Sequence, residues 1–191
     1  MLEAALFLFA RRGFHGTSVR DLAERLEQQP SALYKHFASK EHILSALVQH
    51  GYATHHQVLL DGLLSAGASP VDQLQILVEV NARSHARWPL LAVVIHEEAH
   101  ALPDDLLGPV LALRDASVAL LLRIVQRGIS AGVFDVVDVP TTAAAIGAMG
   151  VRIPLWFHEQ PGFDIDTMAH RQALLALRMV GATSALSAKA T

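Results

Sequence analysis

Apolar residues recur along the whole chain at spacings of three and four positions, and no segment shows sustained alternation of apolar and polar residues. Spacings of three and four place residues on one side of an α-helix, whereas alternation is the mark of a half-buried strand. Leu2, Leu6 and Phe9 show the helical pattern at the start of the chain. The sequence therefore predicts an all-α protein.

Proline and glycine residues divide this pattern into separate helices. The predicted helices cover residues 1–12, 18–26, 30–37, 39–64, 70–87, 89–101, 104–131, 140–158 and 165–183. Pro154 stands inside the eighth of these helices and is expected to kink or end it, because proline removes a backbone donor and crowds the preceding turn.

The two short helices near the start, residues 18–26 and 30–37, are separated by only a few residues. Ser18 and Asp21 have the spacing of a capping box, and Pro30 suits the first turn of a helix. Helices this short form no core alone, so they fit a helix-turn-helix whose second helix can enter a DNA major groove. A helical hairpin with a solvated polar face is the alternative.

Packing decides which side chains of this region are free to meet DNA. Leu33 and Phe37 are needed inside, which leaves the intervening and preceding positions for the groove. The candidate base-reading residues are Gln29, Pro30, Ser31, Ala32 and Lys35, and the candidate phosphate-binding residues are Thr17, Ser18, Tyr34, His36 and Lys40.

Composition narrows the class of protein. The 191 residues are 52% hydrophobic and include no cysteine, and the mean hydropathy is +0.34. No apolar stretch approaches the roughly 18 residues of a membrane helix, so we expect no membrane partner and assign the apolar surplus to an internal pocket or a subunit interface. The lack of cysteine excludes disulfides and thiolate metal sites, and no export signal is evident. We expect a cytoplasmic protein without a cofactor.

Charge is distributed unevenly. Residues 1–50 hold six Lys/Arg and five Asp/Glu, a net of +1, and residues 51–191 hold nine and thirteen, a net of −4, which together give the overall −3. The less acidic front is a weak indication of a nucleic-acid partner.

A candidate effector site lies in the apolar stretch 143–157. Arg152 and Trp156 are four positions apart and would share one helix face. A buried arginine needs an anionic partner, and a tryptophan beside it offers an apolar wall. The pair predicts a lipophilic effector with an anionic group, and the alternative is an Arg152 paired to an acidic side chain of a neighbouring helix.

The run from His96 to His100 reads His-Glu-Glu-Ala-His, the spacing that places two imidazoles and a glutamate on one helix face in zinc proteases. Such a site needs a third ligand, and the extended pattern fails because Pro103 and Leu106 stand where glycine and histidine are required. A metal-dependent hydrolase or metal sensor stays an alternative. We expect His96 and His100 to line an effector pocket and the protein not to be an enzyme.

Small and apolar residues in two segments suit a subunit interface. Residues 143–150 allow close helix approach, and with the last helix they would build a four-helix bundle across a two-fold axis. Close packing within one chain would use the same residues. The candidate interface residues are Ala144, Gly147, Ala148, Ala173, Leu174, Leu177 and Val180.

About 45 residues at the start resemble the TetR family of transcriptional regulators. The matching positions are Ala4-Ala5, Gly13-Phe14, the run Thr17 to Ala23, and the run Leu33 to Glu41, which reads Leu-Tyr-Lys-His-Phe-Ala-Ser-Lys-Glu. The resemblance implies a three-helix DNA-binding domain over residues 1–46 and a helical effector-binding and dimerisation domain over residues 47–191. It also implies a homodimeric repressor on a near-palindromic double-stranded DNA operator. The phosphate contacts that it implies come from Thr17, Tyr34, His36 and Lys40, and the base-reading positions are the same as those named above.

The rest of the chain adds a departure and a second resemblance. Glu27-Gln28-Gln29 stands where the family turn usually reads Gly-Val-Ser, which removes a flexible glycine. Scattered positions between Ile95 and Phe157 are similar to effector domains of TetR-type regulators of lipid and steroid catabolism. That similarity implies a small lipophilic effector such as an acyl-coenzyme A or related acid. The connectivity of the chain makes the fourth helix, residues 39–64, the expected relay to the DNA-binding domain.

Overall fold

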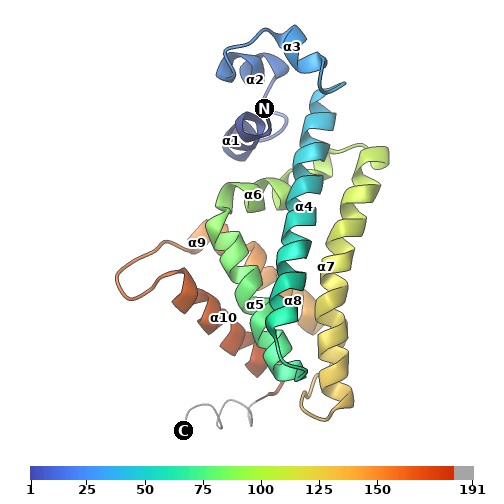
Figure 1. Ribbon diagram of the computed structural model, residues 1–191, viewed down its shortest axis with the longest axis vertical. Coiled ribbons are helices and arrows are strands. Elements are labelled where there is room, and N and C mark those ends of the chain that lie inside the picture. Colours follow the sequence, from blue (N-terminus) through green and yellow to red (C-terminus); the bar gives the residue numbers. More distant parts are fainter. Residues whose placement is uncertain (183–191) are drawn as a thin grey trace. The chain divides into compact units, whose positions relative to one another are not determined.

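The computed structural model describes residues 1–182. Helices joined by turns make up this range, and its β pairing is limited to an isolated bridge between Gln160 and Phe163. The helices are α1 (Leu2–Arg12), α2 (Val19–Arg25), α3 (Pro30–Tyr34), α4 (Lys40–Ser65), α5 (Pro70–Arg87), α6 (Pro89–Glu97), the 3₁₀ turn η1 (Ala99–Ala101), α7 (Asp104–Ser130), α8 (Val139–Val151), α9 (Ile153–Trp156) and α10 (Ile165–Met179) (Figure 1). The all-α prediction is confirmed.

The helix boundaries differ from the prediction in two places that matter for function. The helix predicted over 89–101 is wrong, because α6 ends at Glu97 and a 3₁₀ turn follows. The helix predicted over 140–158 ends at Val151, and Pro154 stands in the short α9, as expected from the missing proline donor. The predicted end of the last helix at residue 183 lies outside the described residues.

The chain forms two compact units. Unit 1 contains Met1–Thr54 and Trp88–Arg114, and unit 2 contains His55–Arg87 and the chain from Asp115 onward. Unit 1 therefore combines the front helices with α6, η1 and the first part of α7, a grouping that differs from the division expected at residues 46 and 47. Within the described residues, no helix is both long and apolar enough to cross a membrane.

The core of unit 1 is apolar and joins segments distant in sequence. Phe9, Phe14 and Leu33 belong to one buried cluster with Ile95 and residues of α4. The absence of a side chain at Gly51 lets α4 approach α6 closely, because a Cβ there would lie 2.7 Å from the Ile95 side chain. Packing thus holds α6 next to α4 beneath the front helices.

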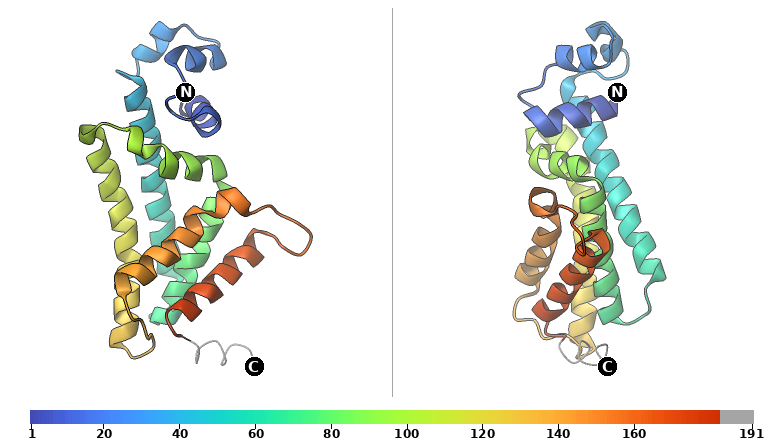
Figure 2. Two further views of the ribbon diagram at one scale, coloured as in Figure 1. Left: turned by 180° about the vertical axis from the view of Figure 1, so that it is seen from behind. Right: turned by 90° about the vertical axis from the view of Figure 1, so that its left-hand side faces the viewer.

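Unit 2 has its own core around α5. Leu74, Leu77 and Val78 of α5 pack with Ile124 of α7 and Leu177 of α10 in a second buried cluster. Figure 2 shows α8 and α10 on one side of this unit, and the two helices are in contact with each other and with α5.

Candidate DNA-binding surface and effector region

The start of α2 is fixed by a complete capping box, as the sequence predicts. The Asp21 backbone N–H donates to Ser18 Oγ at 3.1 Å, and the Ser18 backbone N–H donates to the Asp21 carboxylate at 2.7 Å. Hydrogen bonds from the Ser18 side chain and backbone lower the pKa of the Asp21 carboxyl, and Arg12 pairs with the same group at 3.2 Å. These bonds satisfy helix N–H groups that the chain would otherwise leave without a partner.

The turn between α2 and α3 contains a backbone conformation that favours glycine. Glu27 has φ +54°, and it follows a Schellman ending in which the Gln28 N–H reaches Ala23 O at 2.9 Å and the Glu27 N–H reaches Glu24 O at 3.0 Å. A glutamate in the left-handed region is strained relative to glycine. The departure of this turn from the family pattern therefore has a local energetic cost.

Helix α3 presents a polar surface over a single buried residue. Leu33 is the one residue of α3 that is fully buried, and Phe37 is half-buried against the same cluster. The predicted DNA-facing side chains at the surface are Ser18, Gln29, Ser31, Tyr34, Lys35 and His36, and Pro30 and Ala32 are half-buried. All of these residues except Ser18, which is the N-cap of α2, lie on this short helix and its flanks.

Two predicted phosphate-binding residues are instead directed into the protein. Thr17 is buried and its hydroxyl donates to Gly13 O at 2.9 Å. The Lys40 ammonium donates to the backbone oxygens of Phe14 and Thr17, both at 2.7 Å, and lies 4.1 Å from the Phe14 ring centroid. Both side chains hold the loop between α1 and α2, because its backbone oxygens need donors. Their contacts with phosphate stay predictions.

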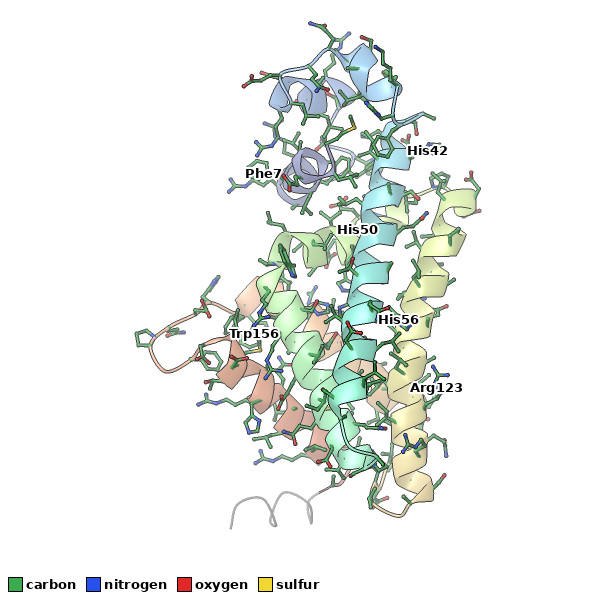
Figure 3. All side chains as sticks on the ribbon, in the orientation of Figure 1. Phe7, His42, His50, His56, Arg123 and Trp156 are labelled. Carbon is green, nitrogen blue, oxygen red and sulfur yellow. The ribbon has the colours of Figure 1, made fainter. Side chains whose placement is uncertain are left out.

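Unit 2 contains a polar belt, which we define as His55, His56, Ser84, His85 and Ser117. His55 Nδ1 lies 3.2 Å from Ser84 Oγ, which joins α4 to α5. His56 Nδ1 lies 3.0 Å from Ser117 Oγ, which joins α4 to α7, and Figure 3 shows His56 on the side of α4 toward α7. Hydrogen-bonding groups from three helices therefore meet between apolar segments.

His85 is the most buried member of the polar belt. Its side chain is directed inward, its ring lies 5.1 Å from the ring of His55, and its Nδ1 lies 2.8 Å from Asn81 O. Burial lowers the pKa of the imidazole, and the hydrogen bond to Asn81 only partly opposes that effect. A neutral ring that donates through Nδ1 carries its lone pair on Nε2. Burial thus favours the neutral form of His85.

A second polar network fastens α10 to α5. The buried Glu79 carboxylate accepts from Gln75 at 3.1 Å, from Arg83 at 3.2 Å and lies 3.1 Å from His170 Nδ1. Arg83 also donates to Asp166 at 2.6 Å. Burial acts to raise the pKa of Glu79, but the hydrogen bonds from Gln75 and His170 and the charge of Arg83 outweigh it and lower the pKa. The Glu79 carboxylate has three side-chain partners, so we interpret this network as structural.

The predicted effector pair is at the surface. Arg152 forms the junction between α8 and α9 and is exposed, and Trp156 is 45% exposed beside Phe157 (Figure 3). The prediction of a buried arginine on an apolar helix face is therefore corrected, because α8 ends at Val151 and the intended face does not continue. The neighbouring Ile153 is buried with Ala82 of α5, so α9 packs on the helix that carries Ser84 and His85.

The histidine pair His96 and His100 lacks the geometry of a zinc-protease helix. His96 is on α6, His100 is exposed on the 3₁₀ turn η1, and the α-helix ends between them at Glu97. The His96 ring makes an edge contact with the Tyr52 ring, with centroids 6.0 Å apart. Among residues 1–182, no three His, Cys, Asp or Glu side chains are grouped to hold a metal ion.

The predicted interface residues separate into two sets. Ala144 and Ala148 of α8 are exposed, and Gly147 and Leu174 are partly exposed. The other three predicted residues are buried in the core of unit 2, namely Ala173, Leu177 and Val180. This corrects their assignment, because α10 turns that face toward α5 and leaves Leu175 and Met179 exposed instead.

The polar belt was not predicted from the sequence, whereas most of the residues predicted to face DNA lie at the surface of the protein. The belt depends on pairs 29 and 61 residues apart, and such pairs leave no local pattern. The available signal was the polar interruption of an apolar helix at His55-His56, within a chain that has eleven histidines.

Two family models match the chain. The model for bacterial regulatory proteins of the tetR family matches residues 1–47, and the model for the tetracyclin repressor-like C-terminal domain matches residues 67–180, which is more than half of the chain. The first match contains α1 to α3, and the second contains all of α5 to α10.

Several known proteins that are similar to this chain in sequence or fold are described as regulators. The repressor KstR2 of Mycobacterium tuberculosis strain H37Rv is 30% identical over 105 residues, which are 55% of this chain and 52% of KstR2, so the chain spans about half the length of that relative. A tetR-family regulatory protein from Rhodococcus RHA1 has a TM-score of 0.87 and 29% identity over 94% of both chains. AibR in complex with isovaleryl coenzyme A and operator DNA has a TM-score of 0.83 and 23% identity, over 94% of this chain and 95% of AibR.

Proposed function

This chain belongs to the TetR family of bacterial regulatory proteins, and on that premise we propose that it is a cytoplasmic, homodimeric repressor released from its DNA operator by a lipophilic effector. The observation that carries the proposal is the polar surface of α3. Its buried Leu33 anchors a five-residue helix, and Ser31, Tyr34 and Lys35 stand exposed around it. Exposed polar side chains on a short, anchored helix are what reading a major groove requires.

The DNA contacts in this proposal divide into two kinds. Gln29, Ser31 and Lys35, with the half-buried Pro30 and Ala32, face base edges, while Ser18, Tyr34 and His36 contact phosphates. Thr17 and Lys40 take part indirectly by holding the preceding loop.

Footprinting tests the DNA-binding proposal. DNase I digestion of the DNA upstream of the gene should show one protected, near-palindromic site, with half-sites about one helical turn apart or slightly more. Uniform digestion with and without protein would contradict the proposal.

The effector site proposed here is centred on the polar belt. Polar groups among apolar helix faces are the usual mark of a small-molecule site. His55, Ser84 and His85 place hydrogen-bonding groups between α4 and α5, and such groups suit an oxygen of a largely apolar effector. Arg152 and Trp156, exposed on α9, are suited to hold an anionic part that stays near the surface. AibR illustrates that this fold accommodates an acyl-coenzyme A.

Thermal shift tests the effector site. We expect a matching member of a panel of acyl-coenzyme A thioesters, free fatty acids and sterols to raise the melting temperature of the parent, since a ligand stabilises the state it binds. Ser84→Ala should reduce this shift in melting temperature, because it removes the hydroxyl group that His55 contacts. His50→Ala should keep the shift, because His50 is exposed on α4, the helix that also carries His55. Equal shifts in the parent and Ser84→Ala would contradict the site.

The dimer proposed here uses the exposed faces of α8 and α10. Ala144 and Ala148 are small and exposed on α8, and Leu175 and Met179 are exposed apolar residues on α10. Exposed apolar residues next to small ones suit a two-fold helix bundle. Leu175→Glu should give a monomer in sedimentation velocity, whereas Leu64→Glu, at another exposed leucine, should leave the dimer intact. A Leu175→Glu dimer would contradict this interface.

A further inference from the structure

The loop between α1 and α2 is held by a residue that is distant in sequence. The backbone N–H of Phe14 donates to Glu98 Oε2 at 2.9 Å, across 84 residues of sequence. Glu98 directly follows α6, and it lies in the segment matched by the C-terminal family model. The carboxylate therefore links that segment to the front of the chain.

The backbone of Phe14 is also held through its carbonyl group. Lys40 donates to Phe14 O, and the Phe14 ring is buried against Phe9 with centroids 5.5 Å apart. The loop conformation requires glycine at two positions, because Gly13 has φ +73° and a Cβ at Gly16 would lie 2.2 Å from a backbone oxygen of α1. Both polar groups of Phe14 are thus fixed by charged side chains.

The position of Glu98 is itself well determined. Tyr52 of α4 donates to Ile95 O of α6 at 3.2 Å, and Gly51 lets Ile95 pack closely. Glu98 is half-buried, and its neighbour Glu97 is exposed. A carboxylate on a firmly packed helix end gives a charge-assisted bond with a defined direction.

We propose that Glu98 is a positioning residue for operator binding. It holds the Phe14 peptide so that the loop ending at Ser18 starts α2 in the orientation that DNA requires. Glu98 contacts no DNA in this account, and a change at the end of α6 alters operator affinity through the loop. The DNA part of this inference rests on the proposed function.

Because Glu98 is negatively charged, the direction in which its removal changes operator affinity tests the proposal. Removing a carboxylate from a DNA-binding unit reduces repulsion of phosphate and by itself tightens binding. Loss of a positioning bond weakens binding instead. Glu98→Ala should therefore lower operator affinity about tenfold, the scale of a lost bond to a charged group, and the slope of affinity against salt should stay that of the parent.

Two variants serve as controls. Glu98→Gln removes the charge but keeps an oxygen that can accept from Phe14, so its operator affinity should stay within about threefold of the parent. Glu97→Ala removes the neighbouring charge and should leave operator affinity unchanged or slightly higher. Equal operator affinities in Glu98→Ala and Glu97→Ala would overturn the proposal.

Amide hydrogen exchange measured by NMR tests the bond without DNA. In the free protein, the Phe14 amide should exchange faster in Glu98→Ala than in the parent, and at the parent rate in Glu97→Ala. Unchanged exchange in Glu98→Ala would overturn the proposal. A parent protein that binds no operator would contradict the proposed function, and the Phe14 exchange would still decide whether Glu98 holds the loop.

Discussion

The two units place their polar side chains in opposite ways. In unit 1, Ser31, Tyr34 and Lys35 stand exposed over a buried Leu33. In unit 2, the polar belt joins three helices through hydrogen bonds such as that between His55 and Ser84. A surface that meets DNA can be built from neighbouring residues on one short helix. A site that encloses a small molecule needs groups from several helices, and its chemistry is visible only after folding.

The largest effect is expected from a substitution of Leu33, the buried residue that anchors α3 in unit 1. Leu33→Ala should destabilise unit 1 by about 2–5 kcal/mol, because it leaves a cavity under a helix with no other fully buried residue. Urea denaturation checks the loss, and operator binding should fail with it although Leu33 faces no DNA. Tyr34→Ala is the matched control: Tyr34 is 56% exposed, so the free energy of unfolding should stay within about 0.5 kcal/mol. Equal losses in the two variants would contradict the assignment.

The next effect separates binding from stability in unit 1. Lys35→Ala should weaken operator binding by about 1–3 kcal/mol, the scale of one base contact. Its melting temperature should equal that of the parent, because Lys35 is exposed. Fluorescence anisotropy measures the first quantity and calorimetry the second. A lower melting temperature with unchanged operator affinity would show Lys35 to be structural.

A smaller effect concerns the backbone of the turn. Glu27→Gly should stabilise unit 1 by about 1 kcal/mol, because glycine adopts a φ of +54° without strain. Gln28→Gly is the control, since its φ is not positive, and it should be neutral or destabilising through the entropy of the unfolded chain. Thermal denaturation compares the two variants. A destabilised Glu27→Gly would mean that the Glu27 side chain makes a compensating contact.

The smallest effect is a pH dependence from unit 2. Burial lowers the pKa of His85, so below about pH 6.5 the unfolded chain binds a proton that the folded state does not. Folding stability therefore decreases as pH falls through this window. His85→Gln removes the titrating group, and its melting temperature should fall less than that of the parent between about pH 7.5 and 5.5. An equal decrease in both proteins would contradict a neutral, buried His85.

Local patterns predicted the all-α fold and the exposure of most of the residues proposed to face DNA. Leu33, Pro30 and the Ser18 capping box act within a few residues of their own position, so the sequence displays them directly. The same reasoning did not predict the hydrogen bonds of Thr17 and Lys40 within the protein, because their partners are backbone oxygens of a loop whose path the sequence does not reveal.

The contacts within unit 2 were harder to predict, because they join residues that are distant in the sequence. Arg152 does not continue the apolar face of α8, because that helix ends at Val151, before Pro154. Leu177 turns inward because α10 packs on α5, although a partner subunit would have suited it equally. Periodicity shows that a helix has an apolar face but not which neighbour covers it.

The most direct test of the central claim is operator binding across a salt series. Fluorescence anisotropy would compare DNA from upstream of the gene with scrambled DNA of the same length and composition. We predict tight binding to the upstream DNA, about a hundredfold or more weaker binding to scrambled DNA, and roughly a tenfold or greater loss of affinity from about 50 to 200 mM salt. Weak binding that is equal for both DNAs at every salt concentration would contradict the claim that the surface of α3 reads a DNA sequence.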